Sequence, residues 1–168
     1  LGENYVIIKY NRDDSLKYYT KIKDNYCDGC IKNKEKENIM FDLTFSHCNC
    51  TIDCEYLQMM NIYSLNISNT NKLRNLNKII NVTQLNICNT NYSENLSFIN
   101  SDKLKKLTAN SISNKLNLNK FRNLECLIIN DCKNLKDISN LTKLKELRLL
   151  NCKNIKDIGN LGEIKILK

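Results

Sequence analysis

The sequence predicts an α/β-type repeat solenoid, in which short parallel strands stack along one side and irregular segments return along the other. The first observation is a repeat: residues 121–140 read FRNLECLIINDCKNLKDISN and residues 141–160 read LTKLKELRLLNCKNIKDIGN. The second is that six apolar columns keep their register through about six units of 20 to 22 residues between 40 and 168. One unit cannot bury its apolar side alone, so the units must stack.

Each unit begins with a short predicted strand. We number the first Leu of the pattern L-x-x-L-x-[IL]-x-x-C as position 1. Position 1 falls at Met40, Ile62, Val82, Leu104, Leu124, Leu144 and Ile164. Position 4 is always Leu, and position 6 is apolar in all six units that reach it. The alternation over positions 3 to 7 predicts a strand with positions 4 and 6 pointing inward. Positions 3, 5 and 7 then point outward onto a concave parallel sheet.

The second half of each unit is expected to return along the convex side. Its apolar positions are 9, 12, 15 and 18, and a period this short favours 3-10 turns or irregular coil. Position 9 is Cys or Thr in five units, and both side chains can donate a hydrogen bond to a loop carbonyl. Ile112 occupies position 9 in the fourth unit and has no donor, so that unit should be the least regular.

The two ends of the sequence depart from the repeat. Residues 1–39 are expected to form an N-terminal cap, with a degenerate extra repeat as the alternative. Val6-Ile7-Ile8 predicts a strand, and Asp14 or Ser15 could cap a short helix that runs to about Lys23. The sequence stops just after position 4 of a seventh unit, so a C-terminal cap is expected to be absent from it.

Nine cysteines raise the question of a metal site. CDGC at 27–30 and HCNCTIDC at 47–54 contain spacings that zinc sites use. The candidate zinc ligands are Cys27, Cys30, His47 and Cys50. Their neighbours Cys48 and Cys54 fall on core positions 9 and 15, which favours a structural interpretation of the cluster. We therefore expect free thiols and no metal or other cofactor; a disulfide that ties the cap to the first unit is the alternative.

The same sequence gives little support for catalysis. It has one His and four Gly, at 2, 29, 159 and 162, so neither a His-based catalytic group nor a Gly-rich phosphate loop can be assembled convincingly. No catalytic residue is assigned, and we expect a protein that is not an enzyme. No apolar run approaches the roughly 20 residues that a membrane-spanning helix needs.

The outward positions of the predicted strands are the expected binding face. This face carries the cations Lys106 and Arg148 and the anions Asp42, Glu146 and Asp131, so it is nearly neutral despite the net charge of +8. Other lysines fall on turns and on the convex side, which argues against a nucleic-acid partner. An apolar patch with one Arg favours a protein partner in the C-terminal half. The predicted contact residues are Lys106, Cys126, Ile128, Asn130, Glu146, Arg148 and Leu150.

These columns resemble the leucine-rich-repeat family over about residues 40–168, and internalin-like and cysteine-containing repeats are the most similar kinds. The resemblance implies a leucine-rich-repeat horseshoe and a non-catalytic protein–protein interaction module. The Asn/Lys/Ile bias, with repeats such as LNISNT and LNICNT, also resembles leucine-rich-repeat gene families of AT-rich insect poxviruses. That resemblance implies a host-interaction protein in the host cytoplasm. A secreted or surface recognition domain with a disulfide-bonded cap, and the substrate-reading part of a ubiquitin-ligase adaptor, are the alternatives.

Overall fold

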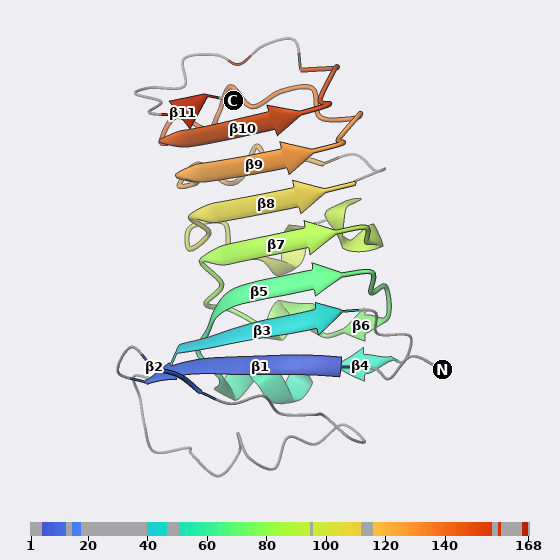
Figure 1. Cartoon of the computed structure of the whole chain (residues 1–168), viewed down its shortest axis with the longest axis vertical. Coiled ribbons are helices and arrows are strands. Elements are labelled where there is room, and N and C mark those ends of the chain that lie inside the picture. The colour runs from blue at the N-terminus through green and yellow to red at the C-terminus, as the bar shows by residue number, and fades with distance from the viewer. Residues whose placement is uncertain are drawn as a thin grey trace.

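The computed structural model describes residues 5–12, 15–17, 40–46, 51–94, 96–111, 116–155, 158 and 166–167. A nine-stranded sheet with the order β11-β10-β9-β8-β7-β5-β3-β1-β2 dominates this part of the chain. Within the part of this sheet that runs from β3 to β11, all neighbouring strands are parallel to one another (Figure 1). Helical structure within the described ranges is limited to short 3-10 turns. A parallel sheet with so few helices is compatible with an α/β repeat-like fold.

The predicted strands over positions 3 to 7 are confirmed in all six units. They are β3 (Met40–Ser46), β5 (Ile62–Ser68), β7 (Gln84–Cys88), β8 (Lys106–Asn110), β9 (Cys126–Asn130) and β10 (Glu146–Leu150). Residues at the same position pair across neighbouring strands, as Leu85, Leu107 and Leu127 do. The strand β11 (Ile166–Leu167) pairs with the start of β10. The sequence period and the sheet register are therefore the same.

The inward direction of positions 4 and 6 is also confirmed. The six Leu residues at position 4, from Leu43 to Leu147, are at most 1% exposed. Position 6 is fully buried from Phe45 to Ile129, whereas Leu149 in β10 is half-buried. The burial of these columns along the whole stack is the main favourable contribution to folding.

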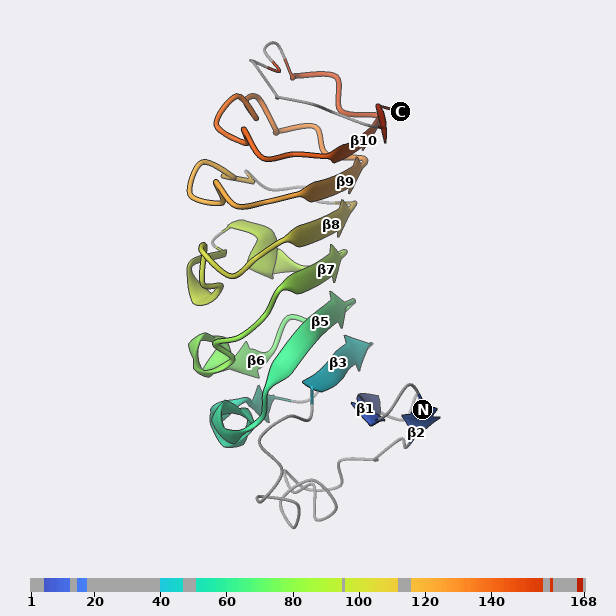
Figure 2. The same ribbon diagram turned by 90° about the vertical axis from the view of Figure 1, so that its left-hand side faces the viewer.

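The return segments lie on the opposite side of the sheet strands (Figure 2). The 3-10 turns are η1 (Glu55–Met59), η2 (Leu76–Lys78), η3 (Asn91–Glu94) and η4 (Leu96–Phe98). Two short strands, β4 (Ile52–Asp53) and β6 (Leu73–Arg74), pair in parallel on this side. The expectation of 3-10 turns and irregular coil is confirmed by η1 to η4 and the coil around them, whereas the β4–β6 pair was not predicted. The expectation that the fourth unit is the least regular stays a prediction, because Ile112 and residues 113–115 lie outside the described ranges.

The strands β5, β7, β8, β9 and β10 are each followed by a residue with left-handed backbone at position 8. These residues are Asn69, Asn89, Ser111, Asp131 and Asn151, with φ between 46° and 57°. Asn and Asp tolerate this conformation better than other residues with a Cβ atom. The backbone N–H of Asn89 donates to the Asn110 carbonyl at 3.1 Å, and the Asn89 side-chain amide donates to Asn69 Oδ1 at 2.6 Å. Part of the Asn bias therefore has a structural use.

Position 9 turns back into the interior directly after this residue. Thr70 is buried, and its hydroxyl donates to the Ser68 carbonyl at 2.9 Å. The thiol of Cys152 donates to the Leu150 carbonyl at 3.4 Å. The predicted donor role of position 9 is confirmed for these two residues, which tie the first inward residue of the turn to the strand that precedes it.

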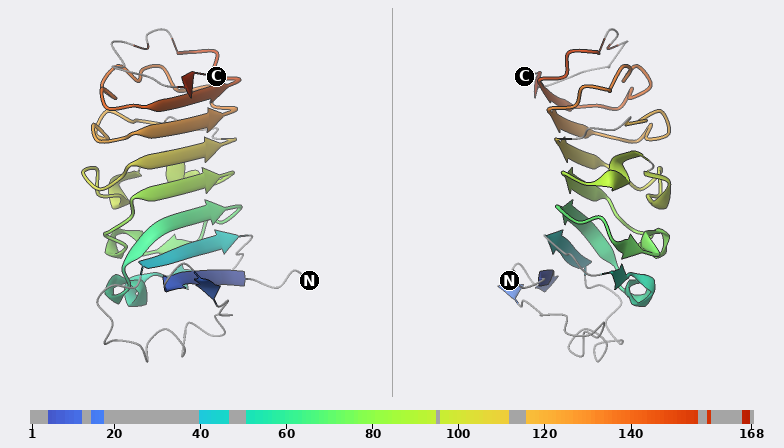
Figure 3. Two further views of the ribbon diagram at one scale, coloured as in Figure 1. Left: turned by 60° about the vertical axis from the view of Figure 1, so that its left-hand side comes forward. Right: turned by 90° about the vertical axis from the view of Figure 1, so that its right-hand side faces the viewer.

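The N-terminal segment corrects one prediction. The strand expected at Val6-Ile7-Ile8 is confirmed as β1 (Tyr5–Arg12), which pairs antiparallel with β3 (Figure 3). The helix expected from Asp14 or Ser15 is wrong at its start, because Ser15–Lys17 form the strand β2 and pair with β1. Only two residues separate Arg12 from Ser15, so pairing with β1 supplies backbone hydrogen bonds at once, whereas an isolated first helical turn is costly. Residues 18–23 lie outside the described ranges, and the cap boundary at 39 stays a prediction.

Candidate functional site

A repeated backbone contact lies at the starts of β8, β9 and β10, where the outward face of the sheet is enlarged. The N–H groups of Lys105 and Lys106 both donate to the Thr83 carbonyl, at 2.8 and 3.0 Å. The N–H groups of Glu125 and Cys126 both donate to the Lys105 carbonyl in the same way. In the next unit the N–H groups of Lys145 and Glu146 both donate to the Glu125 carbonyl. Position 1 is buried, whereas positions 2 and 3 are both partly exposed in β5 and in the units of β8, β9 and β10, so both face outward. The face therefore has four outward positions, 2, 3, 5 and 7, of which the sequence pattern predicted the last three.

The strands β8, β9 and β10 bring all seven predicted contact residues together. The register places Lys106, Cys126 and Glu146 in one row, Ile128 beside Arg148 in the next, and Asn130 beside Leu150 in the third. Leu150 is 58% exposed, and Ile128 is half-buried. We call the seven residues the candidate face: Lys106, Cys126, Ile128, Asn130, Glu146, Arg148 and Leu150.

A polar chain links three residues of the candidate face. The guanidinium Nε of Arg148 lies 2.7 Å from Glu146 Oε1 on the same strand. The thiol of Cys126 donates to Glu146 Oε2 at 3.4 Å from the neighbouring strand. The Asn130 amide donates to Asn110 Oδ1 at 2.6 Å. These contacts hold the polar side chains in fixed positions beside the apolar surface of Ile128 and Leu150, an arrangement suited to recognition.

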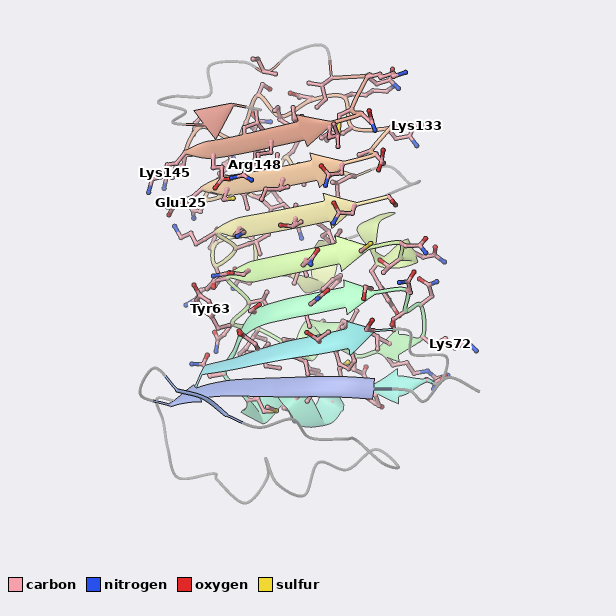
Figure 4. All side chains as sticks on the ribbon, in the orientation of Figure 1. Tyr63, Lys72, Glu125, Lys133, Lys145 and Arg148 are labelled. Atoms are coloured by element: carbon pink, nitrogen blue, oxygen red, sulfur yellow. The ribbon has the colours of Figure 1, made fainter. Side chains whose placement is uncertain are left out.

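The residues at position 2 of these three units belong to the same surface, although the sequence pattern did not predict them: Lys105, Glu125 and Lys145. Glu125 lies between two lysines, with Lys105 Nζ 3.0 Å from its Oε1 and Lys145 Nζ 2.5 Å from its Oε2 (Figure 4). The signal was available in the sequence, because an inward position 1 followed by an inward position 4 leaves two successive residues to face outward. Strict alternation was assumed instead.

The two lysines lower the pKa of Glu125 from 4.5 to about 2, mainly through the hydrogen bonds from Lys145 and Lys105. Stability that comes from a lowered carboxyl pKa is present above the unfolded value and is lost as the pH falls through the folded value. We therefore expect the wild-type chain to lose stability relative to Glu125→Gln between about pH 5 and pH 2. Chemical unfolding of both proteins across this range tests it; parallel pH profiles would contradict the pairing.

Cys126 is a poor nucleophile on this face. Burial, and then the neighbouring Glu146, raise the pKa of its thiol from 9.0 to about 11. At pH 8 the folded protein should alkylate at Cys126 about 100-fold more slowly than the unfolded chain. Glu146→Gln should speed the reaction in the folded protein because it removes the carboxylate. Mass spectrometry of iodoacetamide-treated protein measures both rates, and equal folded and unfolded rates would rule out this environment.

The outward residues of β3, β5 and β7 form a polar surface of another kind. Ser68 donates to Ser46 at 3.0 Å, and Gln84 donates to the Tyr63 hydroxyl at 2.8 Å. In contrast, the side-chain oxygens of Asn66 and Asn86 are buried without a hydrogen-bond partner. Hydrogen bonds thus join polar side chains of neighbouring units at position 7, between Ser68 and Ser46, and at position 8, between Asn89 and Asn69, whereas the side-chain oxygens of the two Asn residues at position 5 are not joined in this way.

The candidate zinc ligands Cys27, Cys30, His47 and Cys50 all lie outside the described residues, so that prediction is untested. Cys54 is fully buried, as its core position predicts, and burial raises the pKa of its thiol to about 12. Within the described ranges, no three His, Cys, Asp or Glu side chains cluster in a way that could hold a metal ion. The same ranges contain no helix with the length and apolar character needed to cross a membrane.

Comparison of the chain with protein-family models, with curated proteins and with solved structures finds no match.

Proposed function

We propose that this chain is a leucine-rich-repeat solenoid, without catalytic activity, that binds a protein partner through the concave side of its sheet. The fold part of the proposal is supported by the agreement of period and register, since each unit of 20 to 22 residues supplies one strand and one return segment. Such a stack carries rows of outward side chains at fixed spacing.

The observation that carries the function is the exposed apolar surface of β9 and β10. Leu150 stands 58% exposed on a regular strand, with Ile128 half-buried in the neighbouring strand. Around them lie the Glu146–Arg148 ion pair and the Asn130 amide. A small apolar centre with a hydrogen-bonding surround is the usual composition of a protein-binding surface. A partner that covers Leu150 would remove most of this apolar area from water.

The raised pKa of the Cys126 thiol argues in the same direction. A nucleophilic cysteine needs a lowered pKa and a neighbouring positive charge, and here the hydrogen-bond partner of the thiol is a carboxylate. We therefore propose a binding role for the candidate face.

A photo-cross-linking amino acid at position 150 tests the proposal in cells or lysate of the native host. We expect a discrete cross-linked protein partner from position 150 and none from the same group at position 80. Ile80 is a matched control because it is 56% exposed but lies in the turn before β7. Ile128→Ser should abolish the cross-link from position 150. Cross-links of equal yield from both positions would reject the candidate face.

A further inference from the structure

The starts of β8, β9 and β10 carry a concentration of positive charge. Residues 102–106, 122–126 and 142–146 contain six cations and three carboxylates, a formal excess of three positive charges. The equivalent residues before and at the start of β5 and β7, 60–64 and 80–84, contain no charged side chain. We call the six cations the basic rim: Lys103, Lys105, Lys106, Arg122, Lys143 and Lys145. Among the strands β5, β7, β8, β9 and β10, the positive charge is therefore concentrated on the three that carry the candidate face.

Contacts between units hold the basic rim in place. Glu125 bridges Lys105 and Lys145 across three strands, so one carboxylate is shared by two ammonium groups. Lys143 Nζ donates to Asn123 Oδ1 at 2.7 Å one unit away. The side chains of Lys105 and Lys145 are still 46% and 62% exposed. Three lysines of the rim are therefore held in place, and the rim as a whole is incompletely neutralised, so it can attract a negatively charged group.

The basic rim and the apolar surface are parts of one face. Figure 4 shows Lys145 and Glu125 at the starts of the strands, and Arg148 further along β10. Lys106 pairs in register with Cys126, and Ile128 follows two residues later on the same strand. From position 2 to position 7 a strand extends roughly 16 Å, the length of about five extended residues. A short segment aligned with the strands can therefore touch both ends.

We infer that the partner contacts this face with an acidic segment that carries an apolar anchor, its carboxylates against the basic rim and its apolar side chain against Ile128 and Leu150. This inference rests on the proposed function and adds the chemistry of the partner. Charge complementarity selects the acidic character, and the exposed Leu150 selects the apolar anchor. A nucleic acid would satisfy the rim but would leave the apolar surface unmatched.

Selection from a phage-displayed random dodecapeptide library on the whole 168-residue chain tests the inference. Selected peptides should be enriched in Asp and Glu and should contain an apolar residue. Their affinities are then measured by fluorescence anisotropy with synthetic peptides. The rim variant is Lys105→Gln with Lys143→Gln and Lys145→Gln. Its matched control is Lys72→Gln with Lys133→Gln and Lys153→Gln, which removes the same charge from exposed lysines outside the rim.

The rim variant should weaken binding about 10-fold or more, and the control less than about 2-fold. Glu125→Gln should strengthen it about 2- to 5-fold, because it removes the carboxylate that competes for the two lysines. Ile128→Ser with Leu150→Ser should also weaken binding. Circular dichroism of each variant establishes that the fold is retained.

Other outcomes overturn the inference. Equal losses of peptide affinity in the rim variant and its control would reject the inference, because they would show that net charge, and not the position of the rim, determines binding. A loss with the Ile128 and Leu150 substitutions alone would keep the proposed function and reject the acidic segment, and no loss with either set would reject both. Tighter binding of poly(U) RNA or duplex DNA that depends on the rim would identify a nucleic acid instead. If no peptide is selected, the inference is rejected, while cross-linking at position 150 still decides the proposed function.

Discussion

Phe121→Ala should lower the free energy of unfolding by about 3–5 kcal/mol, the largest effect we expect from a single substitution. Phe121 occupies position 18 between the units of β8 and β9 and is fully buried. Its backbone N–H donates to the Leu118 carbonyl and its own carbonyl accepts from the Leu124 N–H, so hydrogen-bonded turns fix the backbone on both sides of it. Such a turn cannot collapse easily into the space left by a benzyl group, and the cavity cost adds to the lost burial.

The neighbouring Lys120 should amplify this loss. Its ammonium group lies 4.8 Å from the Phe121 ring centroid and donates to the carbonyls of Leu96 and Ile99 in the preceding unit. Phe121 therefore supports a contact between units, and stacked repeats depend on such contacts for cooperativity. Urea unfolding followed by circular dichroism measures the effect. Arg122→Ala, at the exposed neighbour, should change stability by less than about 0.5 kcal/mol. A loss below about 1 kcal/mol for Phe121→Ala would contradict the assigned packing.

Asn89→Val should cost about 2–3 kcal/mol, because it combines two effects. The backbone of Asn89 has φ 47°, a conformation that is strongly unfavourable for a β-branched residue. The substitution also removes the hydrogen bond from the Asn89 amide to Asn69 Oδ1. Both losses fall on the turn that redirects the chain from β7 into the interior.

Asn89→Gly separates the two contributions. Glycine adopts a positive φ without steric cost, so this variant loses the side-chain hydrogen bond and keeps the turn. Its cost should be about 1 kcal/mol. Urea unfolding of the three proteins under one set of conditions gives the comparison. Equal stabilities for the Val and Gly variants would show that the left-handed backbone at position 8 carries no energetic weight.

The candidate face shows where prediction from the sequence works and where it stops. All seven predicted residues meet on β8, β9 and β10, because residues at the same repeat position pair in register. Their side-chain partners could not be predicted. Whether Glu146 pairs with Lys106 or with Arg148 depends on rotamers and distances, and the structure selects Arg148 at 2.7 Å. Lys105 and Lys145 of the basic rim were not predicted because strict alternation assigns position 2 to the interior, and Lys103 and Lys143 were expected on turns and on the convex side.

The order of apolar residues by itself determined the strands, their inward positions and the parallel stacking of one unit on the next. A column of leucines at a constant period has one way to be buried, and the units must stack to do so. Tertiary contacts alone decided two other features: the left-handed residue that follows β5, β7, β8, β9 and β10, and the pairing of Ser15–Lys17 with β1. Each depends on a backbone hydrogen bond to a neighbouring strand or unit, and a pattern of side chains along one segment does not encode where that partner lies.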